Sequence, residues 1–263
     1  MKLFDTHCHL DFDDFDCDRN DVIKAAKQHG VNDILVPGVA QNHWFKTIEL
    51  CEQHEHCHLA IGLHPIFIEQ HQPQHLNELD ELIETHKPVA VGEIGLDHYK
   101  GDNNKANHYA SHENIEKQNV FFAKQLIIAK QHDLPVIIHN RKAHDLCISM
   151  LNEYGTNKGI IHAFNGSIQQ AYKYIELGFV LGFGGMLTFE RSRKLRTLAQ
   201  QIPIESIVLE TDAPDMTVSK FSGQRNSPEY IPYILESLAM VKKMSKEDVA
   251  AITTETAKRV LTA

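Results

Sequence analysis

Leu3-Phe4-Asp5-Thr6-His7-Cys8-His9 is the stretch around which the rest of this sequence is organised. Leu3 and Phe4 begin a short apolar segment typical of a β-strand, and His7 and His9 follow it two positions apart. Because residues i and i+2 of an extended chain point to the same side, the two imidazoles can bind one metal ion together. The chain has 18 histidines, so chance is the competing explanation for one His-x-His pair. What distinguishes the two explanations is whether other strands also end in metal-binding side chains.

Strand-like segments alternate with segments of helical periodicity along the whole sequence. The expected strands are 3–6, 33–37, 58–62, 88–92, 135–138, 159–161, 179–182 and 206–209. The expected helices are 19–29, 43–54, 76–86, 113–132, 144–154, 168–177, 191–201, 228–244 and 245–261, the last with Ser245 as N-cap and Asp248 three residues later. This alternation predicts a parallel sheet, and a length of 263 residues favours a TIM-type (β/α)₈ barrel forming a single domain over residues 1–263. An open doubly wound sheet is the rival, but no Gly-x-Gly-x-x-Gly follows the first strand.

Composition indicates a globular protein, with 42% apolar and 23% charged residues. No basic start followed by an apolar run marks a signal peptide, and no apolar segment is long enough to span a bilayer. The five cysteines include no Cys-x-x-Cys pair, which predicts reduced thiols in a cytoplasmic protein. The net charge of −9 argues against non-specific coating of duplex DNA. Neither a membrane nor an obligate protein partner is predicted.

Metal-binding side chains follow the expected strands at the end where barrel active sites lie. Any one of them has an ordinary explanation, such as a hydrogen-bonded histidine or an Asp that caps a helix. Groups of this kind after five different strands would repel one another or leave buried charge unless a cation lay among them. The sequence therefore predicts a metal centre with six ligands: His7, His9, Glu93, His139, His162 and Asp212.

Six ligands exceed what one tetrahedral ion needs, so the set predicts two divalent metal ions with one carboxylate shared between them. The many imidazoles favour Zn²⁺ or Mn²⁺ over Ca²⁺, and Zn²⁺, Mn²⁺ and Mg²⁺ are the candidates. The alternative is a single ion, with His139 and His162 binding substrate instead.

Other histidines are not expected to bind metal. His54, His56 and His58 precede the third strand and should lie at the opposite rim of the barrel. His71 and His75 are four residues apart on an expected helix, but they lack the His-Glu-x-x-His arrangement and are interpreted as a solvated face.

The sequence resembles the TatD family of metal-dependent hydrolases, which belongs to the amidohydrolase-like barrels. The resemblance extends over nearly the whole chain. It rests on the motifs Phe4-Asp5-Thr6-His7-Cys8-His9-Leu10, Gly62-Leu63-His64-Pro65, Gly92-Glu93-Ile94-Gly95-Leu96-Asp97, Gln118 with Phe122 and Gln125-Leu126, Pro135-Val136-Ile137-Ile138-His139-Asn140-Arg141, His162-Ala163-Phe164-Asn165-Gly166-Ser167, Leu209-Glu210-Thr211-Asp212-Ala213-Pro214 and Arg225-Asn226-Ser227-Pro228. One departure is Ile66, where many members have a histidine after Gly-x-His-Pro.

The resemblance implies that His7, His9, Glu93 and Asp212 hold one ion. Glu93, His139 and His162 would hold the other, so that Glu93 bridges the pair. It also implies the substrate, because family members are mainly deoxyribonucleases that cut phosphodiester bonds, often from a 3′ end.

The leading hypothesis is therefore a metal-dependent deoxyribonuclease in which Asp212 orients or deprotonates the attacking water. His64 and Arg141 are the candidates for holding phosphate oxygens, although Arg141 can also be a plain surface charge. The basic residues Arg191, Arg193, Lys194 and Arg196 either guide a nucleic-acid backbone or form a solvated helix face. The alternative is a small-molecule amide, ester or lactone hydrolase with the same metal site, and a non-catalytic binding barrel is a third possibility.

Overall fold

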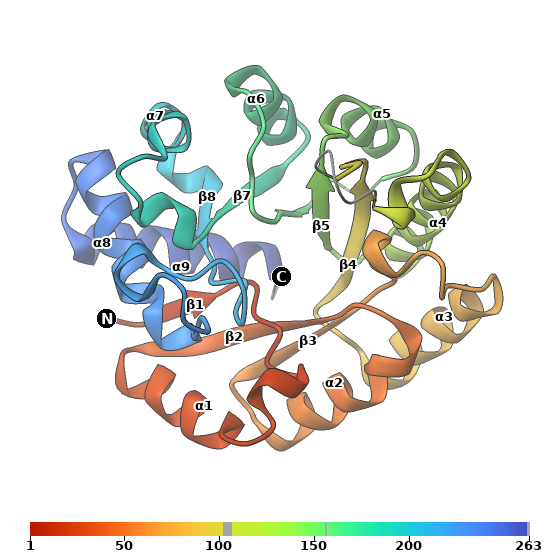
Figure 1. Ribbon diagram of the computed structural model, residues 1–263, viewed down its shortest axis with the longest axis horizontal. Coiled ribbons are helices and arrows are strands. Elements are labelled where there is room, and N and C mark those ends of the chain that lie inside the picture. Colours follow the sequence, from red (N-terminus) through yellow and green to blue (C-terminus); the bar gives the residue numbers. More distant parts are fainter. Residues whose placement is uncertain (102–106, 156, 262–263) are drawn as a thin grey trace.

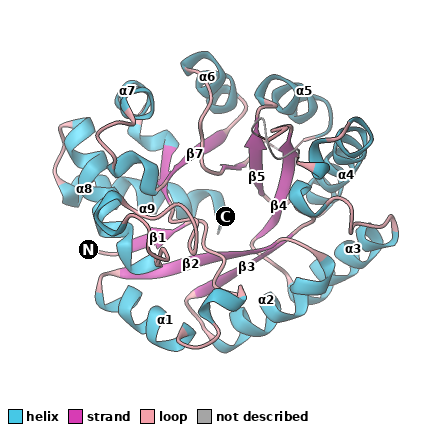
Figure 2. Ribbon diagram, in the orientation of Figure 1, coloured by secondary structure: helices cyan, strands magenta, loops and turns pink. Residues whose placement is uncertain are grey.

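In the computed structural model, which describes residues 1–101, 107–155 and 157–261, a ring of strands is surrounded by helices (Figure 1, Figure 2). All strands pair in parallel and in chain order. The strands are β1 (Leu3–Asp5), β2 (Val31–Gly38), β3 (Cys57–Ile61), β4 (Ala90–Asp97), β5 (Val136–Arg141), β6 (Gly159–Ile161), β7 (Phe179–Phe183) and β8 (Ile207–Leu209). The helices are α1 (Arg19–Gln28), α2 (Gln41–Gln53), α3 (Gln74–His86), α4 (His112–Gln131), α5 (His144–Tyr154), α6 (Ile168–Glu176), α7 (Arg193–Gln201), α8 (Ile231–Lys242) and α9 (Lys246–Leu261).

Backbone hydrogen bonds between the two ends of the sheet close the ring. The Thr6 N–H donates to the Leu209 carbonyl at 3.0 Å, and the Asp212 N–H donates to the His7 carbonyl at 2.8 Å. A parallel bridge between Cys8 and Ala213 continues the contact beyond the strands. The closed parallel ring with outer helices confirms the predicted single-domain (β/α)₈ barrel and excludes the open doubly wound sheet.

The inside of the barrel is filled by one apolar side chain from each strand. These eight residues are Phe4, Leu35, Ala60, Ala90, Ile137, Ile160, Val180 and Val208. Ala257, Val260 and Leu261 of α9 pack against them, and α9 ends near the centre of the ring in Figure 1. The N-terminal end of the barrel is therefore packed shut, which leaves the C-terminal end for a site.

β4 and β5 extend furthest beyond their predicted ends. β4 was expected to end at Gly92 and β5 at Ile138, yet β4–β5 pairing continues to Asp97 opposite Arg141. Gly95 makes this possible: with φ of +142°, it lies so close to β5 that a Cβ there would be 2.0 Å from the His139 carbonyl oxygen. Glu93 and His139 consequently lie within strands and not in loops. Backbone pairing between the two strands holds them rigidly.

Side-chain caps begin several of the outer helices. Ser167 and Gln170 form a reciprocal capping box at the start of α6, and Ser245 accepts the Asp248 N–H at 3.0 Å before α9, as predicted. The eighth helix begins later than expected, because a 3₁₀ turn occupies Pro228–Tyr230. None of the helices in the described part of the chain is long and apolar enough to cross a membrane.

Candidate metal centre

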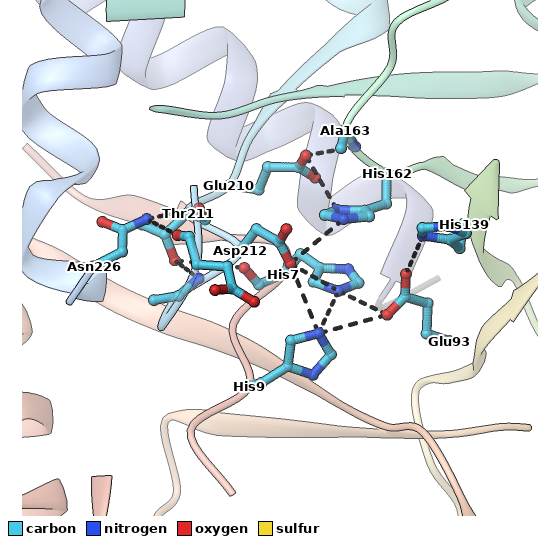
Figure 3. Close-up of polar contacts among 12 residues, drawn as sticks. His7, His9, Glu93, His139, His162, Ala163, Glu210, Thr211, Asp212 and Asn226 are labelled. Carbon is cyan, nitrogen blue, oxygen red and sulfur yellow. Dashed lines mark hydrogen bonds and ion pairs between the residues drawn. The ribbon is translucent and has the colours of Figure 1, made fainter. Parts of the chain in front are cut away.

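The six predicted ligand side chains meet at the C-terminal end of the barrel (Figure 3). His7 and His9 follow β1, His162 follows β6, and Asp212 lies three residues beyond the end of β8. Figure 3 shows the imidazoles and carboxylates turned toward one another from these separate elements. Strand ends that are distant in sequence thus deliver one compact cluster.

His7, His9 and Asp212 form the first group of candidate ligands. The Nε2 atoms of His7 and His9 lie 3.2 Å apart, and each lies 3.7 Å from Asp212 Oδ1. His162 stacks on His7 with ring centroids 3.6 Å apart and places its Nε2 3.5 Å from the same Asp212 oxygen. Imidazole lone pairs and carboxylate oxygens directed at one point form the donor set that divalent transition metals prefer.

Glu93 lies between this group and a second one. Its Oε2 lies 3.1 Å from His7 Nε2, whereas its Oε1 lies 3.3 Å from both His64 Nε2 and His139 Nδ1. The carboxylate is 1% exposed, and Oε1 accepts no hydrogen bond from the described residues. A buried carboxylate oxygen without a hydrogen bond is costly unless a cation neutralises it. The residues present therefore fit a bound metal.

Two further carboxylates lie against the outer nitrogens of His162 and His139. Glu210 Oε1 lies 3.1 Å from His162 Nδ1 and also accepts the Ala163 N–H at 2.6 Å, while Asp97 Oδ2 contacts His139 Nε2 at 3.1 Å. Such partners fix the tautomer and the orientation of a metal-binding imidazole. The sequence motifs contained both carboxylates, but sequence spacing cannot show which strand-end carboxylate faces the ion and which faces a ligand.

The electrostatic environment prepares several of these groups for cation binding. Burial, followed by the neighbouring His7, lowers the pKa of His9 to about 4, so its nitrogen is free to bind a metal at neutral pH. Burial alone would raise the pKa of Asp212, but His162 and the other imidazoles hold it at about 2. His139 differs from these two: burial would lower its pKa, but its contacts with Asp97 and Glu93 raise it to about 9, so a metal ion must displace a proton from this ring at neutral pH.

Hydrogen bonds connect the ends of β1 and β8 beneath the cluster, through Asp5, Thr211 and Asn226. The buried Asp5 carboxylate accepts the Thr211 N–H at 2.9 Å and the Thr211 hydroxyl at 2.5 Å, and it also accepts the His7 N–H at 3.2 Å. Asn226 donates to the Thr211 carbonyl at 2.8 Å (Figure 3). These bonds hold Asp212 in its left-handed conformation, with φ of 59°.

His64, a predicted phosphate-binding residue, is only 5% exposed and approaches Glu93. Its Nδ1 accepts the Ile66 N–H at 3.1 Å, which assigns the proton of the neutral ring to Nε2. An Nε2–H directed into the site is a hydrogen-bond donor rather than a metal ligand. This tautomer favours contact with substrate over coordination, although His64 lies among ligand-type groups.

A cavity of about 1050 Å³ opens onto the cluster. Arg141 lines its wall, and the guanidinium lies 3.7 Å from the centroid of the Tyr99 ring. Arg141 is exposed, but this stacking restricts where it can move. It is held at the mouth of the site, outside the cluster of candidate ligands.

The remaining histidines lie elsewhere. His58 pairs with Asp33 at 2.9 Å, and none of His54, His56 and His58 belongs to a possible metal-binding group among the described residues. The expectation of a solvated His71–His75 helix face was wrong for His71. That ring precedes α3, is 1% exposed, and bonds the His64 carbonyl at 2.9 Å, because it packs beneath the loop that carries His64.

Comparison with known proteins agrees with this arrangement. The profile of a family described as TatD related DNase matches residues 4–262. Uncharacterized metal-dependent hydrolase YjjV of Escherichia coli K12 is 36% identical over 252 residues, or 95% of this chain and 93% of that protein. Uncharacterized metal-dependent hydrolase YabD of Bacillus subtilis 168 is 36% identical over 260 residues, or 98% of each. The crystal structure of YjjV, a TatD homologue, has a TM-score of 0.91 at 34% identity and covers 99% of this chain and 98% of its own.

Proposed function

Because this chain belongs to the TatD family and is a metal-dependent hydrolase, we propose that it cleaves phosphodiester bonds in DNA with two divalent metal ions. The observation that carries the proposal is the position of Glu93, whose two oxygens face different imidazoles. Such a carboxylate can bridge a pair of ions. The implied removal of nucleotides from a 3′ end comes from the family resemblance.

His7, His9, Glu93 and Asp212 would hold one ion, and Glu93, His139 and His162 the other. When bound, Zn²⁺, Mn²⁺ or Mg²⁺ would supply Lewis acidity toward the phosphate and lower the pKa of the attacking water. Both carboxylates of this set, Glu93 and Asp212, line the cavity, where substrate would lie.

Asp212 is the proposed proton acceptor. Its low pKa keeps it ionised at neutral pH, and its side chain is 17% exposed at the cavity, where a water can reach it. A positioned carboxylate there can orient the attacking water and accept its proton. His64 Nε2–H and the Arg141 guanidinium would hold non-bridging phosphate oxygens, Arg141 through its planar fork.

The unpaired state of all five cysteines supports the cytoplasm as the place where this reaction occurs. We propose no membrane or obligate protein partner in the reaction.

A small-molecule ester, amide or lactone hydrolase is the second candidate. The apolar side chains that line part of the cavity, among them Phe12, Ile66 and Phe67, are compatible with it. They would suit an apolar acyl group as well as a nucleobase.

Elemental analysis and one substrate panel test both proposals. We expect two divalent ions per chain, and hydrolysis of single-stranded DNA and bis(p-nitrophenyl) phosphate that a chelator abolishes and added ions restore. At most one ion at saturation would reject the paired-metal site. Hydrolysis of lactones or esters without hydrolysis of phosphodiesters would favour the second candidate.

A further inference from the structure

Three cations at the start of α7 line the same cavity as the metal centre. Arg191, Arg193 and Lys194, here called the basic rim, share that cavity with Glu93 and Asp212. Arg196, the fourth cation of this basic segment, has a different role, because its guanidinium donates to the Leu187 carbonyl at 2.9 Å. The structure thus divides a basic stretch that is uniform in sequence into one structural arginine and three cations at the mouth of the site.

The basic rim is not neutralised by the protein. Across residues 1–101, 107–155 and 157–261, none of the three cations forms an ion pair with a carboxylate, and Arg191 only packs over the Phe189 ring at 4.9 Å. By contrast, Lys46 pairs with Asp13 at 2.5 Å and Arg225 with Asp18 at 2.6 Å. In a chain with a net charge of −9, unpaired cations gathered at a cavity mouth form a local attractor for anions.

Apolar side chains share the cavity with the basic rim and the metal centre. Phe183, Met186 and Met216 line it, together with Leu195 and Leu198 of α7. A single-stranded nucleic acid presents the matching chemistry, because its bases are flat and apolar on their faces while each backbone linkage carries a negative charge. A small ester has no second charge to place at the rim.

We propose that the basic rim binds backbone phosphates of a single-stranded polynucleotide beyond the bond being cleaved, so that strand length determines affinity. This rests on the proposed phosphodiesterase function and adds the residues that select a polymer. The rim acts on binding and touches none of the reacting atoms.

The test compares a dinucleotide, which has only the scissile phosphate, with a ten-nucleotide single strand of DNA. In the triple variant Arg191→Ala/Arg193→Ala/Lys194→Ala, the ratio of kcat/KM for the long strand to that for the dinucleotide should fall about 10- to 100-fold at 0.1 M salt. The slope of log affinity against log salt should decrease by about 2, since each single-strand phosphate contact contributes about 0.7. Fluorescence anisotropy of the labelled strand measures that affinity independently of cleavage.

A matched control removes the same charge elsewhere. Lys24, Lys124 and Lys130 are exposed helix residues that do not line the cavity, and their triple alanine variant should keep the parental ratio and salt slope. An unchanged ratio and slope in the rim variant would overturn the rim proposal while leaving the phosphodiesterase intact. If the parent protein cleaves neither substrate, the proposed phosphodiesterase function fails. In that case, equal affinity of the parent and the rim variant for the labelled strand would also reject the rim proposal.

Discussion

At the scale of single residues, the site depends on carboxylates in two different positions. Glu93 and Asp212 face the place where ions would bind, whereas Glu210 and Asp97 face the far nitrogens of His162 and His139. The same side-chain type therefore serves either as a candidate ligand or as a support for a ligand. Substitutions that remove charge but keep size distinguish the two.

Asp212→Asn should lower the rate of the proposed phosphodiesterase reaction by at least about 10²–10⁴-fold, because it would remove both a candidate metal-binding charge and the proposed proton acceptor. The fold should persist, since Asn keeps the size and tolerates the φ of 59°. Steady-state kinetics with circular dichroism measure the two effects. Asp133→Asn, at another aspartate with positive φ (52°), is the control and should keep the parental rate. A near-parental rate and metal content for Asp212→Asn would leave Asp212 with only a structural role.

Glu210→Gln should weaken metal binding about 10- to 100-fold, because the partner that orients His162 loses its charge. Competition against a chromophoric chelator measures the affinity. Glu205→Gln, at an exposed residue just before β8, should bind metal as the parent does. Equal affinity of parent and Glu210→Gln would show that His162 needs no charged partner.

At the scale of elements, the extended pairing of β4 with β5 places Glu93 and His139 side by side. Gly95 permits the extension by letting the two backbones approach closely. A side chain at this position would push the strands apart where two candidate ligands are carried.

Gly95→Ala should destabilise the protein by about 1–3 kcal/mol from overpacking, in addition to about 1–2 kcal/mol of backbone strain. Urea unfolding measures this loss in the free energy of unfolding, and the metal content of the protein should fall as well. Gly223→Ala separates the two causes, because Gly223 also has positive φ (85°) but a Cβ there would meet nothing within 4 Å. Similar losses in the two variants would mean that the β4–β5 approach imposes no packing constraint.

The sequence predicted the barrel well because its two periodicities alternate clearly, and β6 and α5 have the predicted limits. The predicted end of β4 was too early, because glycines such as Gly92 and Gly95 are typical of strand ends. The close approach of two backbones cannot be recognised from the sequence of one strand alone. The sequence indicated the six ligand-type residues that the structure brings together. It missed the burial of His71 and the pairing of Glu210 with His162, since both depend on contacts between distant segments.

At the scale of the whole molecule, the barrel has two unlike ends. The ligand-type cluster and its cavity lie at one end, and α9 seals the other. Asp33 marks the sealed end, because it contacts both His58 and Lys258 of α9. Histidines at that end are distant from the proposed chemistry.

The triple variant His54→Gln/His56→Gln/His58→Gln should keep its metal content and its activity. The free energy of unfolding should change by no more than about 1 kcal/mol, because the His58–Asp33 ion pair is partly exposed to solvent. Elemental analysis and thermal melting test this expectation. Loss of an ion from this variant would place a metal at the sealed end and contradict the orientation of the site.

The hydrogen bond from Thr6 to Leu209, which closes the ring, joins residues 203 positions apart. His7 and His9 thus leave the ribosome early, while Asp212 emerges near the end of translation. A nascent chain carries its first imidazoles for most of its synthesis without Asp212, one of the two carboxylates that face them. Metal loading of the complete centre must therefore be post-translational or nearly so, and a product of premature termination before β8 would contain most of the candidate ligands yet could not assemble the site.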